Sequence, residues 1–317
     1  MAANWMRRTF VAAACASAAL LAACGSSSTE SAISPQRFIA FGDGLADVGQ
    51  KGSSYTINDG SINNWMLRIS SNYGGTLKPV SAGGLSYAQG NARVTATPDA
   101  AGNAATPTVT QQIDQFLAAN KFADTDLVML SAGASDIIAG MAAVQAGTLT
   151  EEQYVAAAGK AGQELAAQVR RLSDAGAKHI LMTGTYDLSR TPWAKAIKKE
   201  SLISSASRRF NDDLLVNIVD MGKTVLYVDV AYYVNLFEGS PGGYGFTDSS
   251  TPVCTSVDAG PGIGIGAGEV NSALCTTATL LPNANPDRFL FADKVYITPA
   301  AHREFGNYAY DRLRNRW

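Results

Sequence analysis

Acidic residues and glycines follow a short apolar run near the beginning of the chain. The run Phe38–Phe41 leads directly into Gly42-Asp43-Gly44, and Asp47 follows three residues later. This pattern predicts a buried strand that breaks into a tight turn, with its backbone exposed at the carboxyl end of the strand. In open α/β sheets, ligands bind at that edge. The turn at 42–49 is therefore the first candidate for a functional site.

Four carboxylates could act together at such an edge. They are Asp43, Asp47, Asp136 and Asp293. One interpretation is an acidic pocket. The other is that each carboxylate stabilises a turn or a helix terminus by accepting backbone N–H groups. The spacings specify no metal site, and no cofactor is expected.

The elements that would position these residues alternate along the chain. Apolar runs typical of buried strands occur at 38–41, 127–130, 179–183 and 224–230. Segments with helical periodicity lie at 62–73, 111–120, 151–175 and 200–221, and Thr298-Pro299 begins a final helix. This alternation predicts an α/β fold, a three-layer α/β/α sandwich around a mainly parallel sheet.

Four segments resemble the sequence blocks of the GDSL, or SGNH, hydrolase family. They are Phe41-Gly42-Asp43-Gly44-Leu45, Gly83-Gly84-Leu85-Ser86-Tyr87-Ala88-Gln89-Gly90-Asn91-Ala92-Arg93-Val94, Gly133-Ala134-Ser135-Asp136 and Asp293-Lys294-Val295-Tyr296. The resemblance implies an SGNH-hydrolase, flavodoxin-like sandwich. It also implies ester hydrolysis by a serine nucleophile, a histidine base oriented by an aspartate, and an oxyanion hole.

Three catalytic positions of the family carry a different residue in this chain. The nucleophile falls on Gly44, the oxyanion asparagine on Ser135 and the histidine on Tyr296, whereas Asp293 matches the family. The oxyanion hole and pocket would be formed at Gly44, Gly90, Asn91 and Ser135. Glycine offers no nucleophile, and a phenol with a reference pKa of about 10 is a poor general base at neutral pH.

The sequence therefore predicts a pseudoenzyme that cannot hydrolyse esters by the Ser-His-Asp mechanism and keeps the site as a ligand or partner pocket. Tyr296 would fill the space of the histidine, with its hydroxyl near Asp293. One alternative is an active esterase, lipase or acylhydrolase with displaced residues, such as Ser135 with Tyr296 or His302. His179 is interpreted as a structural residue at a strand end. A second alternative is a structural envelope lipoprotein.

The beginning of the chain predicts export and anchoring. Two arginines precede an apolar run that ends in Leu21-Ala22-Ala23-Cys24, which resembles a bacterial lipobox. The resemblance implies lipidation of Cys24; a plain signal peptide cleaved near Ala23 is the alternative. The predicted organisation is a lipoprotein signal peptide at 1–23, a lipidated flexible tether at 24–36 and a single domain at 37–317. We expect the protein in the bacterial cell envelope, lipid-anchored in the outer membrane or else periplasmic or secreted.

The remaining cysteines and the composition add two expectations about chemistry. Cys254 and Cys275 lie in a segment rich in Gly, Pro and Ser, and in an exported chain such a pair commonly forms a disulfide, with two free thiols as the alternative. The formal net charge of −2 argues against nucleic-acid binding. The membrane is expected as a partner through Cys24, and family analogy suggests a lipid, acyl or acylated-glycan ligand.

Overall fold

The structure is a computed structural model of the chain and describes residues 31–317. The predicted signal peptide at 1–23, Cys24 with its predicted lipidation and the first part of the predicted tether lie outside the described residues. Among residues 31–317, no helix has both the length and the apolar character needed to cross a bilayer.

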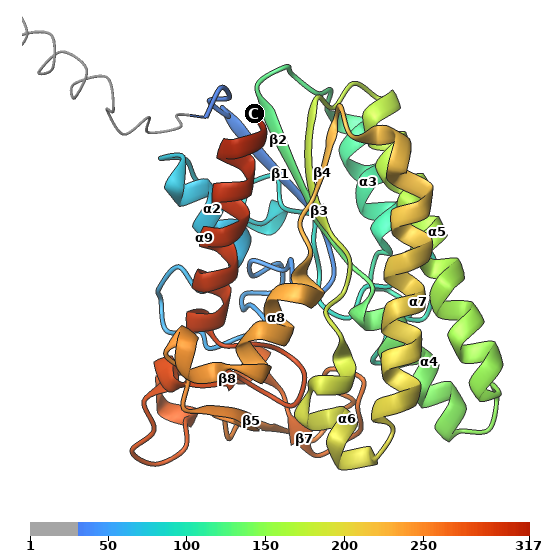
Figure 1. Cartoon of the computed structure of the whole chain (residues 1–317), viewed down its shortest axis with the longest axis vertical. Coiled ribbons are helices and arrows are strands. Elements are labelled where there is room, and N and C mark those ends of the chain that lie inside the picture. The colour runs from blue at the N-terminus through green and yellow to red at the C-terminus, as the bar shows by residue number, and fades with distance from the viewer. Residues whose placement is uncertain (1–30) are drawn as a thin grey trace, which may run out of the picture.

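Four parallel strands form the central sheet in the order β1-β2-β3-β4. They are β1 (Arg37–Gly42), β2 (Asp126–Ser131), β3 (His179–Thr183) and β4 (Val225–Tyr227). Gly42 is paired with Ser131, and Ser131 with Thr183, so the first three strands end in register. Because all the strands run the same way, their carboxyl ends share one edge, which faces downward in Figure 1. We call this surface the carboxyl edge.

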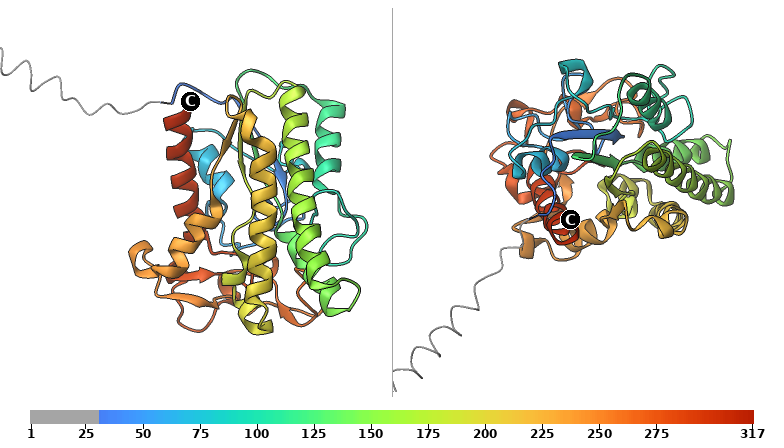
Figure 2. Two further views of the ribbon diagram at one scale, coloured as in Figure 1. Left: turned by 45° about the vertical axis from the view of Figure 1, so that its right-hand side comes forward. Right: turned by 90° about the horizontal axis from the view of Figure 1, so that it is seen from above.

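Helices cover both faces of the sheet, which confirms the predicted three-layer sandwich (Figures 1 and 2). One face carries α3 (Val109–Ala119), α4 (Ala134–Gln145), α5 (Glu151–Asp174) and α7 (Glu200–Ile218). The other face carries α2 (Trp65–Asn72) and α9 (Pro299–Arg316). Two further helices, α6 (Pro192–Ile197) and α8 (Val230–Gly239), lie near the carboxyl edge. Thr298 caps α9 with its side chain and Pro299 opens the helix, as predicted.

The loop-rich segment before α9 packs below the carboxyl edge. It contains two small sheets, formed by β5 (Asp248–Pro252) with β8 (Phe289–Phe291) and by β6 (Val257–Asp258) with β7 (Glu269–Val270). The predicted disulfide between Cys254 and Cys275 is present. Both cysteines are buried in a small apolar cluster with Ile57 and Ala292. The disulfide therefore lies beside the segment that leads into Asp293.

Three helices, α4, α6 and α8, arise where the sequence pattern did not predict them. The strand predicted at 224–230 ends at Tyr227, because the Asp229 side chain accepts the N–H of Tyr232 at 2.9 Å and starts α8. Helix α4 is buried at nearly every position from 134 to 141. A helix that is covered on all sides shows no single apolar stripe, so its periodicity is weak.

Candidate functional site

Gly44, the nucleophile position of the family that the chain resembles, lies two residues after β1 and is buried. A Cβ added to Gly44 would lie 2.5 Å from both Cζ and Oη of Tyr296. Because protein interiors are close-packed, a side chain at position 44 would need the Tyr296 ring to move. The backbone of Gly44 is not in the left-handed region. It is therefore the tyrosine, and not the backbone conformation, that excludes other residues here.

A second tyrosine, Tyr55, packs against Tyr296 and occupies the space beside Gly90, at the predicted oxyanion position. The ring centroids of Tyr55 and Tyr296 are 5.1 Å apart. A Cβ added to Gly90 would lie 1.8 Å from Cε2 of Tyr55. Tyr296 and Tyr55 therefore pack side by side between Gly44 and Gly90, and we call the pair the tyrosine wedge. Sequence analysis missed Tyr55, which comes from a loop with no periodic pattern.

The hydroxyl of Tyr296 makes no hydrogen bond to Asp293. Its side chain is fully buried and fills space beside Gly44, but its Oη has no hydrogen-bond partner among residues 31–317. The contact between the two residues is instead a backbone hydrogen bond: the N–H of Tyr296 donates to Oδ1 of Asp293 at 2.6 Å. Burial raises the pKa of Tyr296 well above the usual value for a phenol, and the nearby Asp43 raises it further. The phenol therefore stays protonated at neutral pH and cannot serve as a base.

Asp293, the one matching catalytic residue, holds the backbone around it. Its Oδ1 accepts the N–H groups of Val295 and Tyr296, and its Oδ2 accepts the N–H of Ser272 at 3.0 Å. Burial raises its pKa, and these hydrogen bonds oppose the rise. The carboxylate thus joins the loop-rich segment to the turn before α9.

The other three carboxylates also accept backbone N–H groups. Asp43 Oδ2 accepts Gly133 at 3.1 Å and Ser135 at 3.3 Å, which ties the turn after β1 to the beginning of α4. Asp136 accepts the N–H of Val94 at 3.0 Å. Burial raises the pKa of Asp43 to about 7 and that of Asp136 to about 6. These contacts match the turn and cap interpretation, and residues 31–317 contain no group of His, Cys, Asp and Glu that could hold a metal ion.

The predicted oxyanion donors are occupied or covered. The N–H of Gly90 donates to Asp47 Oδ2 at 2.8 Å. Asn91 adopts a left-handed backbone with φ 63°, and its side-chain amide donates to the carbonyl of Gly262 at 2.9 Å. Next to that contact, Ile263 is only 1% exposed. A glycine-rich loop therefore covers this side of the site.

Ser135, the serine at the family's oxyanion position, could replace the missing nucleophile, but it is isolated. Its side chain is fully buried, and its Oγ has no hydrogen-bond partner among the described residues. An unactivated serine needs a base within hydrogen-bond reach. Together with the tyrosine wedge, this places packed side chains at the positions that the family resemblance assigns to the site, and the retained pocket stays a prediction.

Neither histidine is placed to act as a displaced base. Nδ1 of His302 accepts the N–H of Trp65 at 3.3 Å, and burial lowers the pKa of His302 to about 3. His179 begins β3 at the opposite edge of the sheet, where its ring lies 5.0 Å from that of Trp317. In the described part of the chain, neither side chain hydrogen-bonds to Ser135 or Tyr296.

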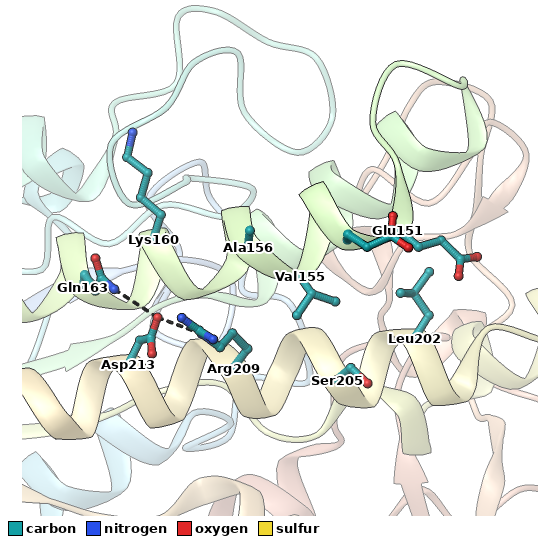
Figure 3. A pocket seen from close by; sticks show the side chains of 10 residues that line it. Glu151, Val155, Ala156, Lys160, Gln163, Leu202, Ser205, Arg209 and Asp213 are labelled. Atoms are coloured by element: carbon teal, nitrogen blue, oxygen red, sulfur yellow. Dashed lines mark hydrogen bonds and ion pairs between the residues drawn. The ribbon is translucent and has the colours of Figure 1, made fainter.

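A groove of about 570 Å³ lies away from these residues, between α5 and α7 (Figure 3). Val155 and Leu202 line it together with charged side chains. Asp213 accepts hydrogen bonds from Arg209 on the same helix and from Gln163 across the groove. No predicted site residue lines this groove. Its Asp, Arg and Gln are already hydrogen-bonded to one another.

Comparisons with known proteins agree with this fold and with the positions of the sequence blocks. Residues 38–309 match the family described as GDSL-like Lipase/Acylhydrolase. The chain belongs to this family. Its fold and the four blocks define it as an α/β/α protein of the GDSL hydrolase class.

Two relatives show how far the similarity extends. A Pseudomonas putida protein described as "Uncharacterized protein in trpE-trpG intergenic region" is 26% identical over 191 residues, which are 60% of this chain and 29% of that protein. The Arabidopsis thaliana "Anther-specific proline-rich protein APG" is 28% identical over 144 residues, 43% of this chain and 25% of that protein. The chain therefore spans less than a third of the length of either relative.

The contact between Gly44 and Tyr296 predicts a thermodynamic coupling. We expect Gly44→Ser to lower the free energy of unfolding by about 1–3 kcal/mol, because the new side chain overpacks against the ring. In a Tyr296→His background, the same change should cost less, with a coupling free energy of at least about 0.5 kcal/mol. Urea denaturation of the four proteins in this cycle measures the difference.

Gly239→Ser is the matched control for this cycle, because an added Cβ there meets no atom within 4 Å. We expect its cost to be equal in both backgrounds. A Gly44→Ser cost that is also unchanged by Tyr296→His would show that the ring does not restrict position 44.

The buried His302 predicts a specific loss of stability in acid. The folded chain keeps this histidine neutral down to a pKa of about 3, whereas the unfolded chain gains a proton below a pKa of about 6.5. Stability is therefore lost as pH falls through this window. His302→Asn keeps an acceptor for the Trp65 N–H but has no titrating group. Between pH 7 and 5, we expect the native chain to lose about 2 kcal/mol more than this variant.

Urea denaturation at the two pH values checks this prediction. The raised carboxyl pKa values contribute to both proteins alike, so the difference reports on His302. His179→Asn is the control, because His179 is partly exposed, and it should change the pH dependence less. Equal pH dependence in the native chain and the His302→Asn variant would contradict the prediction.

Proposed function

We propose that this chain is an exported, lipid-anchored member of the GDSL family that does not hydrolyse esters and acts as a structural or binding protein of the cell envelope. The observation that carries the proposal is the tyrosine wedge. A nucleophile and its oxyanion donors must all reach one reacting atom, each within about 3 Å. In this chain, the rings of Tyr296 and Tyr55 lie between the two positions that would flank that atom.

In this chain, each step of the family reaction lacks the chemical group that it requires. Attack on an ester carbonyl needs an oxygen or sulfur nucleophile, and Gly44 has no side chain. Deprotonation of a nucleophile needs a base, and the phenol of Tyr296 has a raised pKa. Stabilisation of the oxyanion needs free donors, and the N–H of Gly90 already donates to Asp47. Asp293 would orient a base that is not there.

Anchoring is proposed from the sequence of the leader. The segment Leu21-Ala22-Ala23-Cys24 supports lipidation of Cys24 after cleavage of residues 1–23. Bacterial lipoproteins of this kind carry several acyl chains, which hold a protein firmly to a membrane. We propose the outer membrane as the site of attachment. The disulfide between Cys254 and Cys275 supports export, because disulfides form and persist in oxidising compartments outside the cytosol.

The proposal predicts that the purified chain hydrolyses short-chain nitrophenyl esters no faster than a heat-denatured control. Gly44→Ser alone and Tyr296→His alone should also remain inactive, since triad members act as a unit and each variant restores one member without the other. Release of nitrophenol, followed by absorbance, measures this. Clear turnover that is lost in Ser135→Ala or His302→Ala would contradict the proposal and assign the activity to displaced residues.

Anchoring predicts the fate of Cys24→Ala. In a bacterial host, the native chain should fractionate with membranes, whereas Cys24→Ala should be released from them or should retain its leader. Cys15→Ala is the matched control, since Cys15 lies inside the predicted leader, and it should behave like the native chain. Immunoblots of membrane and soluble fractions distinguish these results. Unchanged membrane partition and processing in Cys24→Ala would show that the lipobox assignment is wrong.

A further inference from the structure

The edge of the sheet opposite the carboxyl edge gathers distant parts of the chain. The strands β1 to β4 begin there, and α5, α7 and α9 end there, at the top of Figure 1. We call this surface the amino edge. Arg316 donates to the carbonyl of Gly222, and Trp317 contacts the ring of His179. The end of α9 is therefore held beside the loop before β4 and the beginning of β3.

Cations outnumber carboxylates at the amino edge. Three ion pairs join Arg37 with Asp126, Arg170 with Asp220 and Arg171 with Asp114. The other cations near this edge are Lys121, Lys178, Lys223, Arg312, Arg314 and Arg316, and the other carboxylates are Asp124, Asp174 and Asp311. Apart from the three ion pairs, the amino edge thus has six cationic side chains and three carboxylates.

Three of these cations recur at equivalent places in the topology. Lys121, Lys178 and Lys223 lie in the loops that lead into β2, β3 and β4, one lysine in each loop, and all three are exposed. Among residues 31–317, none of their ammonium groups forms an ion pair. Cations at helix C-termini partly complement the helix dipoles. These three lie beyond the helix ends, where they remain available to an external anion.

Exposed apolar side chains lie at the same edge. Val216 and Val219, at the end of α7, are 70% and 81% exposed. Basic side chains together with exposed apolar groups suit the interface of a bilayer, where both the headgroups and the outer acyl region offer contacts.

The chain enters the domain at this edge. Ser31 Oγ donates to the carbonyl of Trp317 at 2.8 Å and lies 3.0 Å from the hydroxyl of Tyr73. Six residues lie between Cys24 and Ser31, which gives a covalent reach of at most about 25 Å. A lipid on Cys24 would therefore hold the amino edge close to the bilayer.

We propose that the amino edge is the membrane-facing surface of the protein and that Lys121, Lys178 and Lys223 bind anionic lipid headgroups. This inference rests on the proposed anchoring at Cys24. Attraction between exposed charges fades over a Debye length of about 8–10 Å at physiological salt, so the contact acts only at short range, and the tether would keep the amino edge within that range. The carboxyl edge, with the closed site, then faces away from the membrane.

Vesicle sedimentation tests the amino edge without the lipid anchor. The test protein is the chain from Gly25 onward, which keeps every described contact, because those begin at residue 31. We expect it to bind vesicles of phosphatidylcholine mixed with phosphatidylglycerol at least about tenfold more tightly than vesicles of phosphatidylcholine alone. High salt should abolish the difference, because the contact is electrostatic.

Two triple variants with the same change in charge locate the contact. Lys121→Glu with Lys178→Glu and Lys223→Glu should lower the affinity for phosphatidylglycerol vesicles by at least about tenfold. Lys51→Glu with Lys198→Glu and Arg208→Glu changes exposed residues elsewhere on the protein and should leave the affinity within about twofold. Circular dichroism confirms that both variants are folded.

The outcomes separate this inference from the proposed anchoring. Equal loss of affinity in both triple variants, or no preference for phosphatidylglycerol, would overturn the amino edge as a lipid-binding surface. Because the test protein lacks Cys24, neither result depends on whether the full chain is lipidated. Failure of the anchoring proposal would be seen in the fractionation of Cys24→Ala.

Discussion

The packing of Tyr55 and Tyr296 between Gly44 and Gly90 occupies the space that the family's catalytic groups would need at the carboxyl edge. Each ring lies where a Cβ on the neighbouring glycine would have to be, so the two tyrosines and the two glycines are mutually dependent. Buried aromatic rings contribute large apolar contact areas, which makes such a filling stable even though Tyr296 Oη lacks a hydrogen-bond partner in the described residues. The site is closed by ordinary core packing.

Buried carboxylates hold the framework of the family's site together through backbone hydrogen bonds. Asp43, Asp47 and Asp293 each accept N–H groups from segments distant in the sequence: the start of α4, the loop at Gly90 and the loop at Ser272. These hydrogen bonds satisfy backbone donors that would otherwise be buried without a partner. The carboxylates therefore have a structural role that does not need a catalytic serine or histidine. Burial raises their pKa, and the backbone N–H groups that bind them oppose this rise only in part, because such groups carry only partial charge.

The two edges of the sheet then have different physical characters. The carboxyl edge, where the family's chemistry would occur, contains packed tyrosines and a covering loop that bonds to Asn91. The amino edge presents lysines in successive loops and holds Ser31, the first described residue of the chain. A parallel sheet produces this separation, because it places all strand beginnings at one edge and all strand ends at the other.

The sequence alone determined the fold class and the family, and it predicted which residues occupy the family's catalytic positions. Alternating strand and helix patterns are local, and the four blocks are contiguous, so both can be read without coordinates. The disulfide also followed from a lone pair of cysteines in a chain that is predicted to be exported. The sequence pattern did not show α4 and α8, since a helix buried on all sides has no apolar stripe, and a run of valines and tyrosines suits a strand as well as a helix.

Only the tertiary structure decided whether the site is open. Gly44, Tyr55, Gly90 and Tyr296 are spread over more than 250 residues, and no local pattern states that two rings fill the space between two glycines. The position of the Tyr296 hydroxyl beside Gly44 also depends on this packing and not on the matching Asp293. Which side chains fill a space in a core depends on contacts between segments that are distant in the sequence. The sequence therefore indicated which catalytic groups of the family are missing, but not which side chains occupy their space.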